Sequence, residues 1–161
     1  MNRGKIASNF PLARRLGRNK ERRRKAGAAA EADPALKAVL IYENLAAGVR
    51  ARWFLERLAR ASGKTLEEQM WNFDVLGIRE VRNEAANAAR KADVVAISAS
   101  GRLKFPGAVW AWVDMWLWLL EDENPALLAL FDSSESPNVA SVCAYLRCIA
   151  QRAGIEIFFG A

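Results

Sequence analysis

The chain of 161 residues contains no histidine and only two cysteines. Without histidine it cannot have a Ser-His-Asp or Cys-His catalytic group, or a metal site built on imidazole. Cys143 and Cys148 lie five residues apart, outside the CxxC spacing, and on a helix they point in different directions. We therefore expect reduced thiols, no metal site and no catalytic residues of these classes.

Long apolar runs are also missing. Around the tryptophans the longest stretch without a charge is 105–113, which Asp114 ends, whereas a membrane-spanning helix needs about 20 apolar residues. No stretch near the N-terminus has the apolar core of a secretory signal. With 52% hydrophobic and 26% charged residues, the composition is that of a globular domain. We expect a cytoplasmic protein with no membrane partner.

Positive charge is unevenly distributed along the chain. The net charge is +6, but residues 1–30 hold ten of the 24 Lys and Arg residues against the single acid Glu21, and the remainder has 14 basic and 17 acidic residues. A block of like charge such as 22–25 is typical of solvated, disordered chain. We expect a basic tail over residues 1–36 and one α/β domain over 37–161. The tail fits contact with nucleic acid or another polyanion, a transit peptide, or an inert extension.

Short apolar runs alternate with amphipathic segments along the rest of the chain. Continuous apolar runs predict strands that are covered on both faces, and apolar residues at helical spacing predict helices between them. In chain order, the predicted elements are strand 38–42, helix 45–62, strand 68–76, helix 78–91, strand 93–98, a helix from Pro106 to the break at Asn124 and Pro125, strand 126–131, helix 137–153 and strand 155–159. This alternation predicts a three-layer α/β fold with a mainly parallel five-stranded sheet and four helices. Two strand orders are open, the flavodoxin-like 2-1-3-4-5 and the Rossmann-like 3-2-1-4-5.

Two helices allow predictions about their faces. In helix 45–62 the predicted apolar side comprises Leu45, Val49, Trp53, Leu55, Leu58 and Ala59, and the predicted solvent side comprises Arg50, Arg52, Glu56, Arg57 and Arg60. In the tryptophan-rich helix the predicted sheet-facing residues are Val109, Trp112, Val113, Trp116, Leu119 and Leu120. Trp110, Asp114 and Trp118 fall on the other side of that helix. Outward tryptophans favour a self-association surface, with cover by neighbouring helices or by the tail as the alternative.

A ligand site in such a sheet lies beyond the carboxyl ends of the strands, near the point where the strand order reverses. The candidate loops are 43–48, 98–105 and 132–136, and none contains GxGxxG or GxxxxGK[ST]. The candidate ligand-binding residues in these loops are Glu43, Asn44, Ser98, Ser100, Gly101, Arg102, Asp132 and Ser133. The second loop fits an anion or a solvated turn, and the third fits a cation or a helix cap.

The stretches Ala92-Asp93-Val94-Val95, Pro106-Gly107-Ala108 and Val113-Asp114 resemble the strand, loop and helix start of NAD(P)H-dependent FMN reductases in the flavodoxin-like superfamily. The resemblance covers about 25 residues and implies FMN as cofactor. It also implies that the isoalloxazine and phosphate sites are lined by Ser98, Ser100, Gly101, Arg102 and Pro106. Two features of that family are absent. Gly101 and Arg102 replace its Tyr-Asn pair, and 43–48 replaces its Ser/Arg-rich phosphate loop.

Response-regulator receivers are a second comparison within the flavodoxin-like fold. Glu43 and Asn44 occupy the positions of their acidic pair, but Ser98 stands where they carry the phosphoryl-accepting Asp, so a phosphorylatable receiver is excluded. The stretch 42–51 is also similar to a group of uncharacterised bacterial proteins. We expect a self-associating binding or regulatory domain without catalytic residues. An FMN-dependent oxidoreductase and a degenerate receiver are the alternatives.

Overall fold

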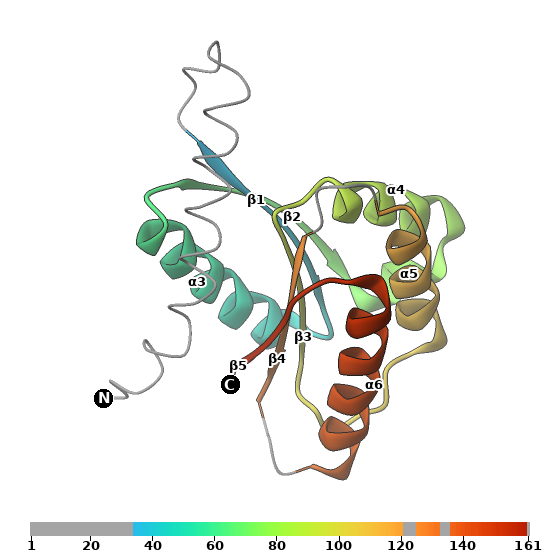
Figure 1. Ribbon diagram of the computed structural model, residues 1–161. Helices are drawn as coiled ribbons and strands as arrows, with labels where there is room; N and C mark the ends of the chain where they lie inside the picture. Colours follow the sequence, from blue (N-terminus) through green and yellow to red (C-terminus); the bar gives the residue numbers. More distant parts are fainter. Residues whose placement is uncertain (1–33, 121–124, 133–135, 161) are drawn as a thin grey trace.

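The part of the chain described by the computed structural model, residues 34–120, 125–132 and 136–160, alternates between strands and helices (Figure 1). In chain order its elements are β1 (Ala35–Tyr42), α3 (Leu45–Ala61), β2 (Thr65–Asn72), the 3-10 helix η1 (Phe73–Gly77), α4 (Arg79–Arg90), β3 (Val94–Ala99), α5 (Gly107–Trp118), β4 (Ala126–Phe131), α6 (Pro137–Ala153) and β5 (Ile157–Gly160). The alternating α/β organisation predicted from the apolar pattern is confirmed.

All five strands run parallel in the order β2-β1-β3-β4-β5. This is the flavodoxin-like order, and the Rossmann-like alternative is excluded. Strand β1 pairs on both sides, so that Ile41 lies opposite Trp71 of β2 and opposite Ile97 of β3. The strand order therefore reverses at β1 and β3, and their carboxyl ends lie next to each other.

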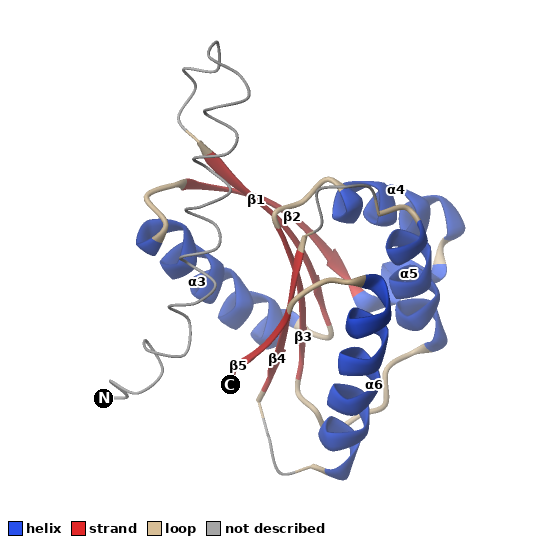
Figure 2. Cartoon of the chain, viewed as in Figure 1, coloured by secondary structure: helices blue, strands red, loops and turns tan. Residues whose placement is uncertain are grey.

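The sheet is covered on both faces, which explains why its strands read as continuous apolar runs. Successive residues of a strand point to opposite faces, and two core clusters follow this alternation. One cluster packs beneath α3 and includes Leu36, Ala38, Leu40, Val94, Ala96, Leu128 and Leu130. The other packs beneath α4, α5 and α6 and includes Val39, Ile41, Val95, Ile97, Leu127 and Phe131. Figure 2 shows the resulting three layers, with α3 on one side of the sheet and the other three α-helices on the opposite side.

The tryptophan-rich helix α5 buries the side that its periodicity predicts. Val109, Trp112, Val113 and Trp116 are fully buried. Leu119 is 40% exposed, contrary to the prediction, because α5 ends at Trp118 and Leu119 no longer follows the helical period. Trp110 is half-buried, with its ring 5.2 Å from that of Phe105 and 4.8 Å from that of Tyr145 on α6, whereas Trp118 is 89% exposed.

The predicted face of α3 is wrong in part. Ala47, Ala51, Leu55, Leu58 and Ala59 face the sheet, but Leu45, Val49 and Trp53 point to solvent. Both sets recur at helical spacing, so α3 carries two apolar stripes. Helical spacing alone does not distinguish the two stripes. In the structure, only the stripe of alanine and leucine side chains packs against the sheet.

Several element boundaries differ from the prediction. Strand β1 begins at Ala35, three residues early, and β2 ends at Asn72, where its side chain accepts a hydrogen bond from the amide of Asp74 and starts η1. Helix α6 begins and ends as predicted, capped by Ser136 and by Gly154 in the left-handed conformation. None of the helices in the described ranges has the length and apolarity of a membrane span.

Candidate functional site

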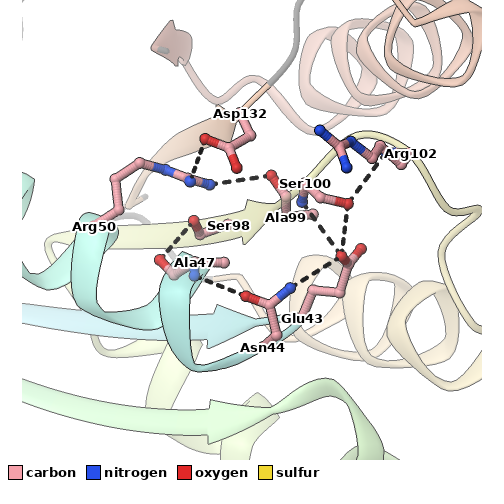
Figure 3. Close-up of polar contacts among 9 residues, drawn as sticks. All are labelled: Glu43, Asn44, Ala47, Arg50, Ser98, Ala99, Ser100, Arg102 and Asp132. Carbon is pink, nitrogen blue, oxygen red and sulfur yellow. Dashed lines mark hydrogen bonds and ion pairs between the residues drawn. The ribbon is translucent and has the colours of Figure 1, made fainter.

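The candidate residues meet at the carboxyl ends of β1, β3 and β4 (Figure 3). The chain turns from β1 to α3 on one face of the sheet and from β3 to α5 on the other, so the two connections diverge at this edge. In parallel α/β sheets this divergence opens the crevice in which ligands bind. In this chain that topological position, called the crevice below, is bordered by loop 43–44, loop 100–106 and Asp132 after β4.

Glu43 ties the first loop to the second. Its backbone N–H donates to the carbonyl of Ser98 at 3.0 Å, which extends the β1–β3 pairing by one residue. Its carboxylate Oε1 accepts from the Ser100 hydroxyl at 2.7 Å and from the Ser100 amide at 3.4 Å. A third donor to the same oxygen is the Asn44 side-chain amide, at 3.4 Å. The carboxylate thus joins the loops after β1 and β3, at the position where ligands bind in parallel α/β sheets.

Asn44 and Ser98 complete the start of α3. Asn44 is the N-cap, and its side-chain oxygen accepts from the amide of Ala47 at 2.9 Å. The buried Ser98 hydroxyl donates to the carbonyl of Ala47 at 2.9 Å. A helix N-terminus binds phosphate through free amides and its positive dipole. In this protein one of those amides is capped, and a carboxylate lies beside the helix end.

Arg50 is a site residue that the sequence interpretation missed. It was predicted on the solvent side of the helix, but its side chain is only 27% exposed and turns inward to the ends of β3 and β4 (Figure 3). Its Nη2 donates to the carbonyl of Ala99 at 3.2 Å, and its Nη1 forms an ion pair with Asp132 at 2.6 Å. The available signal was its position in the second turn of α3, at the end of the helix that lies over the strand ends.

The loop after β3 is held by hydrogen bonds between its backbone and the side chains of Ser100 and Asn138. Gly101 has a φ of 82°, a conformation that favours glycine. The amide of Arg102 donates to the Ser100 hydroxyl at 3.2 Å, and the carbonyl of Arg102 accepts from the side chain of Asn138 on α6 at 3.1 Å. The side chain of Arg102 itself is exposed. This loop is therefore a fixed turn that presents two cations, Arg102 and Lys104, to solvent.

The structure brings together Glu43, Asn44, Ser98, Ser100, Gly101, Arg102 and Asp132 at one edge of the sheet. Ser133 and most of the predicted basic tail, residues 1–33, lie outside the described residues. The predicted interface residues Trp110, Asp114 and Trp118 belong to α5, and the ring of Trp110 lies against Phe105 of loop 100–106. Among the residues that the structure describes, no group of three or more His, Cys, Asp and Glu side chains is placed to hold a metal ion.

The thiols lie on α6, apart from the site. Burial raises the pKa of the Cys143 thiol above its usual value, and the Arg147 guanidinium opposes the shift. Cys148 is exposed. Neither thiol is among the groups that border the crevice.

Fold and site together define a parallel α/β domain of flavodoxin-like topology in which polar side chains at the strand ends contact one another. Comparison with protein-family models gives no match, and comparison with curated proteins gives none either.

Proposed function

We propose that the protein is a flavodoxin-like binding or regulatory domain that associates with itself and acts through protein contacts, not through catalysis or a bound cofactor. The observation that carries this proposal is the bond between Glu43 and Ser100 across the crevice. Arg50 also pairs with Asp132 and donates to the carbonyl of Ala99. The polar groups at the strand ends thus contact one another within the chain. Exposed apolar side chains on α3 and α5 supply surface for a partner.

The principal alternative is an FMN-dependent oxidoreductase. A flavin phosphate carries negative charge and requires free backbone amides or cations in the first loop. The two-residue turn from β1 to α3 places the Glu43 carboxylate there and caps the helix with Asn44. These contacts oppose an anion at the position where the resemblance would place the phosphate.

The degenerate receiver is a subordinate form of the same proposal, because such a domain also works through protein contacts. A phosphoryl acceptor at the end of β3 has to face the crevice. Ser98 is fully buried and donates to a helix carbonyl instead. A receiver-like role would therefore depend on surface contacts, without phosphoryl transfer at this position.

A flavin titration tests the proposal. FMN fluorescence is followed while full-length protein is added to a fixed FMN concentration, with riboflavin as the matched ligand that lacks the phosphate. We expect no saturable quenching with either ligand. Stoichiometric quenching with FMN would contradict the proposal and favour the oxidoreductase.

A variant identifies the cause of the expected result. Glu43→Ser removes the carboxylate and leaves the Asn44 cap in place. If the carboxylate is what opposes anions, this variant gains a measurable, salt-sensitive affinity for FMN over wild type, while Asp114→Ser on α5 does not. An unchanged Glu43→Ser variant would show that the crevice excludes anions for another reason.

The proposal also includes a cytoplasmic location and a polyanion contact for the basic residues 1–30. The charge of that segment, ten basic residues against one acid, supports the contact. Its signature would be an affinity for DNA or RNA that falls steeply with salt in the full-length protein.

A further inference from the structure

Helix α3 has an apolar stripe that points away from the sheet. Leu45, Val49 and Trp53 recur every fourth residue and are 77%, 60% and 59% exposed. Residues at this spacing lie one above the other along a helix. The three side chains therefore form one continuous outward ridge, separate from the stripe that packs on the sheet.

Among the described helices, α3 alone covers its face of the sheet, and the other three α-helices lie on the opposite face (Figure 2). No described helix packs over the outward ridge. Two charged side chains beside it have contacts within the chain. Arg52 forms ion pairs with Glu56 and Glu68, and the Arg57 guanidinium lies 4.7 Å above the Trp53 ring.

We infer that the occupant of this ridge is a second copy of the same chain, whose α3 packs antiparallel across a twofold axis at Val49. This inference rests on the self-association in the proposed function and assigns its surface. A twofold interface requires a patch that complements itself. Rotation about Val49 places Val49 beside its own copy, and it places Leu45 against the larger Trp53 of the partner. The ridge therefore complements itself, as a twofold interface requires.

The packing geometry fits the same arrangement. Side chains four residues apart form the ridges of the commonest class of helix packing, in which the axes cross at about 50° and each ridge lies beside its copy. Crossing helices contact each other over about two turns, and the ridge from Leu45 to Trp53 covers nine residues, about 12 Å of helix axis from the first to the last. The apolar length matches the length over which two crossed helices touch.

Charge supports a second copy over a partner of unrelated sequence. In the antiparallel arrangement, Arg57 lies at the level of the N-terminus of the partner's α3, beside the partner's Glu43. The two Arg57 residues lie about 24 Å apart along the axis, well beyond the screening length of about 8 Å in physiological salt. The arrangement brings these opposite charges together. The two Arg52 residues lie closer, about 9 Å apart along the axis, but each already pairs with Glu56 and Glu68 of its own chain.

Sedimentation equilibrium of the full-length protein tests the inference. We expect a dimer with a dissociation constant on the order of micromolar, because three apolar side chains per copy form a small interface. Val49→Glu places two carboxylates on the twofold axis and should raise the dissociation constant at least tenfold. Ile78→Glu is the matched control, because Ile78 is 53% exposed outside the ridge, and it should leave the constant unchanged.

Other outcomes separate the inference from the proposed function. If Trp118→Glu dissociates the dimer and Val49→Glu does not, the α3 surface is wrong and self-association stands. If the wild-type protein is monomeric up to 100-fold above that micromolar range, both are overturned. Circular dichroism checks that each variant is folded. A higher dissociation constant can then be attributed to the interface and not to unfolding.

A cross-linking experiment tests the axis itself. In a Cys148→Ser background, Val49→Cys places the same thiol on both sides of the twofold axis and should give a disulfide-linked dimer under mild oxidation. Ile78→Cys in that background should remain monomeric under the same conditions. Equal cross-linking of the two variants would contradict the proposed axis.

Discussion

Replacing Arg50 by methionine removes the contacts that join α3 to the ends of β3 and β4 but keeps an unbranched side chain of similar length. Wild-type Arg50 donates to the carbonyl of Ala99 and pairs with Asp132. Methionine retains the packing of the Arg50 stem and loses both polar contacts. We expect the variant to fold with reduced stability.

The size of the loss follows from the exposure of the partners. A hydrogen bond from a charged group contributes about 1.5–3 kcal/mol when buried. Arg50 is 27% exposed, and the Ala99 carbonyl keeps a second donor, the Asp132 amide at 3.2 Å, so the lower end applies. Asp132 is 58% exposed, and an ion pair in such a position contributes about 0–1 kcal/mol. Together, Arg50→Met should cost about 1.5–2.5 kcal/mol and lower the melting temperature by about 3–10 °C for a chain of this length.

Urea and thermal denaturation followed by tryptophan fluorescence measure this loss. Asp132→Asn removes only the exposed ion pair and should cost under about 1 kcal/mol. Arg60→Met is the control, because Arg60 is exposed in the last turn of the same helix. A change within about 0.5 kcal/mol for Arg50→Met, the usual range for surface substitutions, would show that Arg50 does not hold the strand ends.

Two further predictions concern buried groups. Ser98→Asp should destabilise the fold by several kcal/mol, because it places a carboxylate in a fully buried position facing the Ala47 carbonyl; a stable, folded variant would reopen the receiver-like interpretation. The exposed Cys148 should react with iodoacetamide well before Cys143, as read by mass spectrometry of labelled peptides, and equal rates would contradict the burial of Cys143. Because burial raises the pKa of the Cys143 thiol, stability should be complete below the unfolded thiol pKa of about 8.5 and decline as the pH rises through the folded value. Cys143→Ala should abolish that decline.

The strands and their layers could be predicted because burial on both faces leaves a direct mark on the sequence. Strand β4 was found with its observed bounds, and all six of its residues are buried. Edge strand β2 was displaced by several residues, since half-exposed positions weaken its pattern and η1 continues its apolar residues. The strand order could not be decided from local pattern, because both open orders use the same elements and differ only in long-range pairing.

The loops that carry the candidate residues could be placed at one edge of the sheet, because the topology alone puts the strand ends there. The contacts among these residues were not foreseen. Helical spacing shows that Arg50 lies between two apolar stripes but does not show which stripe the sheet selects. The same ambiguity assigned Leu45, Val49 and Trp53 to the core, although they are exposed. Side-chain volume decides the outcome, since alanine and glycine at 47, 48 and 51 let α3 approach the sheet closely.

Native mass spectrometry of the full-length protein, purified without added cofactor, tests the central claim most directly because it reads bound small molecules and chain number together. The proposed function predicts a species of two chains with no added mass, in equilibrium with single chains on dilution. A single-chain species that carries the mass of FMN would contradict it on both counts.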